Sequence, residues 1–305
     1  MKYRITLSVL VTLLLMSGCA EQESRQVDVQ TGSKPVVYVS NYPLHYFIER
    51  IAGDLIDIRF PVGESGDPAL WKPGAEDIAA MQQGDLILLN GASYEQWLSY
   101  VTLPQSRVID TAAAFSDTLI PTEETISHTH GPEGEHAHEG TAFTTWLDLT
   151  LALEQARAVK QALIVLRPQQ RAQIDERFTP LEKELTALDA EIKSTAASAP
   201  EIRVIFSHPV YQYFKRRYGV QGNSVHWEPD VMPDEKMWNE FQQLLKEQPA
   251  KWMLWEGEPL PEIVERLSGL GVESVVVNPC GNTPDSGDFL SVMRQNIESL
   301  KRVFP

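Results

Sequence analysis

Histidines gather in one short segment of the chain. Four of the seven lie within residues 128–138, with glutamates between them: His128, His130, His136 and His138. Neutral imidazole is a good ligand for zinc, copper and nickel, and short histidine-rich tracts are typical of metal binding. This density argues against the alternative interpretation, a solvated polar loop with incidental histidines.

The backbone of this segment is expected to be irregular. Gly131, Pro132 and Gly134 disfavour a rigid helix or strand and favour a mobile, exposed loop over residues 122–141. A mobile loop does not supply the fixed geometry of a closed structural zinc site. We therefore expect a low-affinity loop that collects metal.

Alternating strands and helices precede this loop. Strands are expected at residues 36–40, 55–62, 85–90 and 107–110, and helices at residues 43–52, 76–83 and 94–100. Strands separated by helices predict βαβ units and a largely parallel sheet.

The middle of the chain is expected to be helical. Apolar residues at helical spacing predict one helix over residues 149–166 and a second over residues 168–197. Pro180 falls inside the second helix, where it should kink the helix or restart it with Thr179 as the cap.

The alternation of strands and helices resumes after residue 200. Strands are expected at residues 203–206, 223–226, 252–255 and 274–277, and helices at residues 210–217, 234–246, 261–267 and 287–303. The fold class is therefore α/β, with two parallel-sheet α/β lobes joined by a long helical connection. The N-terminal lobe would span residues 35–165, the connecting helix residues 166–199 and the C-terminal lobe residues 200–305. Because ligands of parallel sheets bind beyond the carboxyl ends of the strands, we expect a ligand cleft between the lobes.

The start of the chain predicts export. Lys2 and Arg4 precede an apolar run over residues 5–16 that is too short to cross a membrane, which needs about 20 apolar residues. Residues 1–18 are therefore interpreted as a signal peptide. Met-Ser-Gly-Cys, ending at Cys19, resembles a bacterial lipobox, so we expect lipidation at Cys19 and a periplasmic protein anchored to a membrane. The alternative is an ordinary signal peptide with an incidental cysteine. Residues 19–34 are polar and suit a flexible tether.

Cysteine content and charge argue against an intramolecular disulfide and against a nucleic-acid partner. If Cys19 is lipidated, Cys280 is the remaining cysteine and no intramolecular disulfide can form, so stability must come from a hydrophobic core. The net charge of −16 argues against a nucleic-acid partner and suits a protein that handles cations.

Motifs along most of the chain match one family of binding proteins. They are V-V-Y-V-S-N-Y-P-L from residue 36, K-P-G-A-E-D-I from residue 72, W-L-D from residue 146, F-S-H-P-V-Y-Q-Y-F from residue 206 and M-R-Q-N-I-E-S-L from residue 293. With the histidine-rich loop between them, residues 35–304 resemble the zinc- and manganese-binding proteins of bacterial ABC importers, the ZnuA/TroA-like cluster. The order and spacing of the motifs carry this resemblance.

The resemblance implies a monomeric binding protein for Zn²⁺ or a similar divalent metal. The metal would lie between the two lobes and pass to an ABC permease that is driven by a separate ATPase subunit. The chain has no nucleotide-binding motif of its own, which is consistent with that division of labour.

The family resemblance also implies four ligand positions, typically histidine, histidine, histidine or glutamate, and aspartate. His208 matches the third position. Asp67 stands where the first histidine is expected, Thr144 where the second is expected, and Asn278 in place of the final aspartate. The inherited site is therefore largely rewritten.

A rebuilt metal site would account for these differences. Asp67, His208, His226 and Glu256 would give a mixed nitrogen and oxygen set that zinc accepts in a tetrahedral site. Further candidates follow the expected strands of the C-terminal lobe: Glu228 and Glu258, which each precede a proline and could be exposed turn residues, and Cys280, which would favour a softer metal as a thiolate or be an inert buried thiol.

A degenerate cleft or a changed ligand class would account for them as well. In a protein with a degenerate cleft, the histidine-rich loop would be the functional site of a metallochaperone or metal buffer. In a protein with a changed ligand class, the cleft would bind a chelated metal or a small organic solute. A group of tryptophans makes this conceivable, because aromatic surfaces line organic-ligand pockets, although core packing explains them equally well: Trp71, Trp146, Trp227 and Trp255.

No catalytic constellation of weight is present in the sequence. It contains no H-E-x-x-H, no G-x-S-x-G and no glycine-rich phosphate loop. A zinc hydrolase with Glu256 as a base beside a metal on His208 is a minor alternative. We therefore predict that the protein is not an enzyme.

Overall fold

The computed structural model describes residues 33–62, 66–129 and 135–305. The expected signal peptide at residues 1–18, Cys19 and nearly all of the tether at residues 19–34 lie outside the described residues, as does His130. Residues 34–305 form one unit, and the following paragraphs concern this unit.

The N-terminal sheet has four parallel strands in the order β2-β1-β3-β4. They are β1 (Val36–Val39), β2 (Asp57–Arg59), β3 (Leu86–Leu89) and β4 (Val108–Asp110), connected by helices that include α1 (Tyr42–Ala52) and α2 (Ala75–Gln83). All four residues of β3 are buried, as expected for the inner strand of a covered parallel sheet. The side chain of Asn41 begins α1 by accepting a hydrogen bond of 3.1 Å from the backbone N–H of Leu44.

The C-terminal sheet repeats this design with the order β10-β9-β7-β8, again parallel. Its strands are β7 (Arg203–Phe206), β8 (Gln221–Ser224), β9 (Trp252–Trp255) and β10 (Glu273–Val276), and its helices are α5 (Gln212–Tyr218), α6 (Glu235–Glu247), α7 (Pro261–Gly269) and α8 (Phe289–Val303). These two sheets confirm the predicted fold class. β8 begins and ends two residues earlier than the strand that we expected at residues 223–226.

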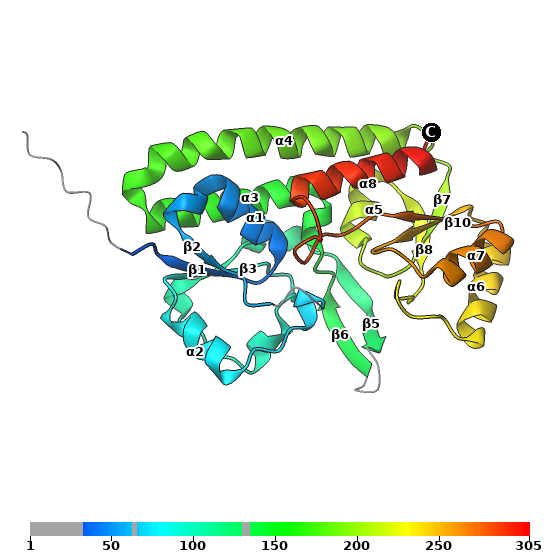
Figure 1. Ribbon diagram of the computed structural model, residues 1–305, viewed down its shortest axis with the longest axis horizontal. Helices are drawn as coiled ribbons and strands as arrows, with labels where there is room; N and C mark the ends of the chain where they lie inside the picture. The colour runs from blue at the N-terminus through cyan, green and yellow to red at the C-terminus, as the bar shows by residue number, and fades with distance from the viewer. Residues whose placement is uncertain (1–32, 63–65, 130–134) are drawn as a thin grey trace, which may run out of the picture. The chain divides into compact units, whose positions relative to one another are not determined.

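Two long helices pack against each other, and the longer one extends over both sheets (Figure 1). The predicted helix over residues 149–166 is confirmed as α3 (Leu149–Leu166), and α4 (Arg171–Ala197) follows it. At 1.5 Å per residue, α4 is about 40 Å long, enough to span two lobes. One hydrophobic core joins residues of both sheets to α1, α3, α4 and α8. Because this core is continuous, the lobe boundaries that we placed in the sequence stay a prediction.

Pro180 does not restart α4, which corrects one of the two outcomes that we expected there. The helix continues through this residue, so Thr179 is not a cap. Pro180 is exposed, and the backbone carbonyl that loses its partner at this point can reach water. The hydroxyl of Thr179 also donates a hydrogen bond of 3.1 Å to the backbone carbonyl of Asp175.

The histidine-rich segment is not an irregular loop, and this prediction was wrong. Strands β5 (Pro121–Thr129) and β6 (Glu135–Thr141) pair as an antiparallel hairpin. The glycines and the proline that we took as breakers all lie between the two strands, outside the described residues. The strands themselves carry threonines and an isoleucine, which favour extended backbone.

Short 3₁₀ helices complete the fold. Residues 94–100, expected to form a helix, hold a 3₁₀ turn instead, because Ala92 and Ser93 turn the chain sharply with positive φ angles just before it. The 3₁₀ helices are Gly53–Leu55, Pro68–Leu70, Gln96–Ser99, Gln105–Arg107, Ala113–Thr118, Thr145–Leu147 and Pro168–Gln170. Within the described residues, no helix has the length and apolar character needed to cross a membrane.

Candidate metal centre

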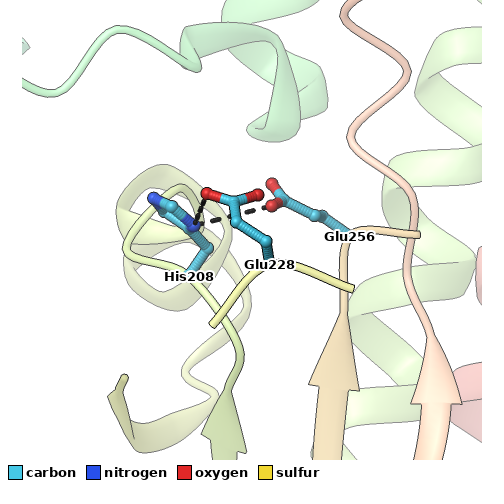
Figure 2. A group of neighbouring side chains, drawn as sticks. All are labelled: His208, Glu228 and Glu256. Carbon is cyan, nitrogen blue, oxygen red and sulfur yellow. Dashed lines mark ion pairs between the residues drawn. The ribbon is translucent and has the colours of Figure 1, made fainter. Parts of the chain in front are cut away.

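Three metal-ligating side chains meet at the carboxyl edge of the C-terminal sheet. His208 follows β7, Glu228 follows β8 and Glu256 follows β9, and these three strands are neighbours in the sheet (Figure 2). One ligand atom from each residue lies within 4.8 Å of the others. The Nδ1 atom of His208 is 3.5 Å from Oε1 of Glu228 and 3.5 Å from Oε1 of Glu256.

Backbone hydrogen bonds beyond the strand ends fix these residues in place. The N–H of Ser207 donates to the carbonyl of Leu254 at 2.8 Å, and the N–H of Trp227 donates to the carbonyl of Ser207 at 2.7 Å. The ring of Trp227 is buried in the C-terminal core, packed between Trp238 and Phe241. The backbone on either side of the cluster is therefore held before any ligand arrives.

The burial and negative charge of the cluster favour the binding of a cation. The side chain of His208 is 5% exposed, and those of Glu228 and Glu256 are each 24% exposed. Burial, followed by the charges of Glu228 and Asp67, raises the pKa of Glu256 to about 8. A divalent metal between the carboxylates would offset their repulsion, and its binding would release the proton that Glu256 holds at neutral pH.

A cavity of about 820 Å³ lies in front of the cluster, between residues of the two lobes. Its volume falls in the range of small-molecule binding pockets. The N-terminal side contributes polar and aromatic residues, and the C-terminal side contributes the cluster and the loop after β10. Among the lining residues are Asp67, Trp71, Tyr94, Phe143, Thr144, Trp146, His208, Glu228, Glu256, Asn278 and Cys280.

The cavity residues that stand at the other expected ligand positions are engaged in the fold. An oxygen of Asp67 accepts the backbone N–H of Ala69 at 2.9 Å. The hydroxyl of Thr144 donates a short hydrogen bond to the carbonyl of Val210. The side-chain oxygen of Asn278 accepts the backbone N–H of Cys280 at 2.6 Å.

The structure places the other predicted ligands differently. His226 is exposed and lies outside the cavity lining, with its ring edge-on to that of His208 at a centroid distance of 5.7 Å. Glu258 is also exposed and outside the lining. Cys280 lines the cavity but is 3% exposed, and burial raises the pKa of its thiol to about 12, so the thiol is protonated at neutral pH in the metal-free protein.

The hairpin gives the histidine-rich segment a defined register. His128 pairs with His136 across the two strands, and Ile126 pairs with His138. Because residues alternate between the faces of a strand, His128, His136 and His138 share one face of the hairpin.

A buried polar network shapes the N-terminal wall and was not foreseen from the sequence. Asn90 follows β3, and its side-chain oxygen accepts hydrogen bonds from Asn41 at 3.0 Å and from Gln155 at 3.1 Å. Its side-chain nitrogen donates to the backbone carbonyl of Phe143 at 2.9 Å. The network therefore ties two strand ends and α3 to the chain segment that carries Thr144.

Comparison with known proteins identifies the family. The family model described as zinc-uptake complex component A, periplasmic, matches residues 37–303. The chain belongs to the ZnuA family. Membership of a zinc-uptake component family agrees with the prediction that the protein is not an enzyme.

Relatives of the ZnuA family are distant in sequence. The chain is 24% identical over 312 residues to the zinc-binding lipoprotein AdcA of Streptococcus pneumoniae, an alignment that covers 99% of this chain and 60% of that protein. The chain thus spans 60% of the length of that relative. It is also 24% identical to the high-affinity zinc uptake system protein ZnuA of Bacillus subtilis, over 94% of this chain and 93% of that one.

The fold is shared with solved structures. The crystal structure of the metal-dependent lipoprotein YcdH from Bacillus subtilis superposes with a TM-score of 0.75 at 20% identity, covering 89% of this chain and 99% of that one. All four positions at which the ZnuA family resemblance implies a ligand line the cavity: Asp67, Thr144, His208 and Asn278.

Proposed function

We propose that this member of the ZnuA family is an extracytoplasmic solute-binding lipoprotein. It captures Zn²⁺, or a similar divalent metal, in the cavity between its lobes and delivers it to an ABC permease. Family membership supports the uptake role, and the names of the AdcA and YcdH relatives, both lipoproteins, support a lipid anchor at Cys19. The signal sequence at residues 1–18 supports export to the periplasm.

The cluster of His208, Glu228 and Glu256 is the observation that carries this proposal. An imidazole and two carboxylates supply three ligands of the kinds that bind zinc, and a fourth position of a zinc site is often filled by a ligand from outside the protein. Asp67 lies across the cavity and is close enough for its charge to raise the pKa of Glu256. Its carboxylate would add to the attraction for a cation.

Metal titration of three proteins tests the proposal. Stoichiometry and affinity for Zn²⁺ would be measured by calorimetry for the full chain, for His208→Ala and for a variant lacking residues 124–140. We expect the deletion variant to keep one tight metal and His208→Ala to lose it. If tight binding disappeared with the hairpin and persisted in His208→Ala, capture in the cavity would be wrong.

A second function, metal buffering by the hairpin, is favoured by one observation. The register places His128 opposite His136 and puts His138 on the same face. We propose that this face holds a second, weaker metal. The same titration examines this site, because the full chain should bind more than one Zn²⁺ and the deletion variant should bind one. An unchanged stoichiometry after deletion would contradict it.

A further inference from the structure

The proposed metal ligands lie on one side of the cavity. His208, Glu228 and Glu256 all follow strands of the C-terminal sheet, and within the described part of the chain they form the one group with metal-ligand spacing. A zinc ion that they hold has at least one coordination position that faces the cavity.

The polar groups elsewhere in the cavity are poorly placed to complete the coordination. The hydroxyl of Thr144 donates its proton to the carbonyl of Val210, and the side-chain oxygen of Asn278 accepts the N–H of Cys280. Both oxygens keep a lone pair, but these hydrogen bonds hold them in fixed orientations within the fold. The carboxylate of Asp67 lines the cavity but does not belong to the group of three residues whose ligand atoms lie within 4.8 Å of one another.

The space in front of the cluster is far larger than a metal needs. The cavity measures about 820 Å³, whereas one water molecule occupies about 30 Å³ of the liquid. Aromatic side chains form much of its N-terminal wall. Trp71 lies edge-on to Trp97 at 5.8 Å, and Tyr94 lies edge-on to Phe143 at 5.3 Å and to Trp146 at 5.7 Å. Aromatic walls of this kind bind flat organic groups.

The charges of the cavity select for cations. Its lining contains the carboxylates of Asp67, Glu228, Asp230 and Glu256, and no lysine or arginine occurs among the described lining residues. A ligand that carried several negative charges would be repelled. A neutral or zwitterionic chelator keeps the charge of its metal complex positive or zero and would be accepted.

One buried hydroxyl is available to orient an organic ligand. Tyr94 lines the cavity and is 1% exposed, and its hydroxyl makes no hydrogen bond with the residues that the structure describes. Burying a hydroxyl without a partner costs free energy, so a ligand that supplied an acceptor at this point would recover it.

We infer that the cavity takes its metal as a complex with a small neutral or zwitterionic nitrogen chelator. His208, Glu228 and Glu256 hold the metal, the chelator fills the open coordination positions, and its body packs against Trp71 and Tyr94. This inference rests on the proposed capture of metal by the cluster and names the form in which the metal arrives.

The experiment compares zinc alone with preformed complexes of zinc. Titrations of the full chain would use ZnCl₂, an equimolar mixture of zinc and 1,10-phenanthroline, which is neutral and flat, and an equimolar mixture of zinc and L-histidine. Zinc nitrilotriacetate, whose complex is negatively charged, is the matched control. We expect the phenanthroline or histidine complex to bind at least tenfold more tightly than zinc alone, and native mass spectrometry to find one metal and one chelator on each chain.

Variants locate the chelator. Trp71→Ala should bring the ratio of the affinity for the zinc complex to the affinity for zinc alone close to one. Tyr94→Phe should lower this ratio severalfold for the histidine complex, whose carboxylate can accept from the hydroxyl, but not for the phenanthroline complex, whose two nitrogens are bound to zinc; its effect on folding should be small. Tyr100→Ser removes an exposed aromatic residue outside the cavity lining and should leave the ratio as it is in the full chain. A ratio for the histidine complex that Trp71→Ala and Tyr94→Phe left unchanged would overturn the inference.

The remaining outcomes separate this inference from the proposed function. If zinc alone bound tightly and the chelators only stripped it from the protein, the inference would fail while capture of free metal would stand. If phenanthroline or histidine bound equally well without zinc, the ligand would be an organic solute, and the inference would fail. If zinc bound in neither form, the proposed function itself would be wrong.

Discussion

The two walls of the cavity use polar residues in opposite ways. On the C-terminal wall, His208, Glu228 and Glu256 bring their ligand atoms close to one another from three strand ends (Figure 2). On the N-terminal wall, the side chain of Asp67 caps a 3₁₀ helix, and the hydroxyl of Thr144 donates a hydrogen bond to the carbonyl of Val210. The polar groups of the first wall have metal-ligand spacing, whereas Asp67 and Thr144 on the second wall make hydrogen bonds within the fold.

This difference teaches where function resides within an inherited fold. Both walls stand at the carboxyl ends of parallel strands, where the topology of α/β proteins places ligands. Topology therefore determines where a site can lie, and the residue types decide which wall can supply metal ligands. Substitutions on the two walls should separate metal affinity from stability.

The largest effect is expected for Glu256→Gln on the C-terminal wall. Zinc binding in small structural sites is worth about 10–16 kcal/mol over about four ligands, so one ligand contributes about 3 kcal/mol, or a factor of about 100 in affinity. We expect this loss of Zn²⁺ affinity in a competition titration against a coloured zinc chelator.

The control for this variant is Glu258→Gln, two residues further along the same turn, where the side chain is exposed and outside the cavity lining. Its affinity should equal that of the full chain. Above pH 8, where the carboxyl of Glu256 is ionised and repelled by Glu228, metal-free Glu256→Gln should also melt at a higher temperature than the metal-free full chain. Equal zinc affinities for the two variants would place the ligands elsewhere.

A smaller effect, on stability alone, is expected from Glu95 behind the N-terminal wall. Its carboxylate is 5% exposed and accepts the backbone N–H groups of Asn90 at 2.6 Å and Gly91 at 3.2 Å. Burial outweighs these hydrogen bonds and raises the pKa of Glu95 from 4.5 to about 7. The folded protein therefore holds a proton between these two pH values that the unfolded chain has released. Its contribution to the free energy of unfolding is complete below pH 4.5 and is lost as the pH rises to 7.

Urea unfolding between pH 4.5 and 7.5 measures this dependence. The loss is about 3 kcal/mol at most, at 1.36 kcal/mol for each pH unit. The measurement belongs in the Glu256→Gln background, so that the raised pKa of Glu256 does not contribute. Addition of Glu95→Gln should flatten the decline, because the amide does not titrate. Two parallel curves would show that Glu95 is already ionised in the folded protein near pH 5.

The sequence predicted the fold better than it predicted which polar side chains lie close together at the strand ends. Alternating strands and helices gave two parallel sheets, because periodicity and chain order determine that topology. The position of His208 at the end of β7 followed from the same reasoning. Glu228 was weighed but left out of the predicted set, because a glutamate before a proline could be an exposed turn residue. The strand before it was also placed two residues too late along the chain. The true end of β8 at Ser224 depends on its pairing with Phe206, a contact between residues distant in sequence.

The histidine-rich hairpin was missed for a related reason. Glycine and proline near residue 132 were taken to break the whole segment, although they interrupt only its middle. Threonines in both strands and the isoleucine of the first strand favour extended backbone, but a two-stranded ribbon forms only when both strands pair. The buried network around Asn90 had no signal in the sequence, because its members come from four separate segments of the chain.

The smallest effect is expected for Thr144→Val, which tests the N-terminal wall directly. The substitution keeps the shape of the side chain and removes the hydrogen bond to the carbonyl of Val210. A typical hydrogen bond contributes about 1 kcal/mol, so the free energy of unfolding should fall by about that amount. Thr145→Val is the matched control, since Thr145 donates to Gln155 at 3.2 Å inside the core and does not line the cavity. Both variants should lose similar stability and keep the zinc affinity of the full chain within about twofold, a difference of about 0.4 kcal/mol. A tenfold loss of affinity in Thr144→Val alone would mean that the hydroxyl turns to the metal when zinc binds. In that case the second position of the ZnuA family site would still function with an oxygen ligand, and the contrast between the two walls would hold only for the metal-free protein.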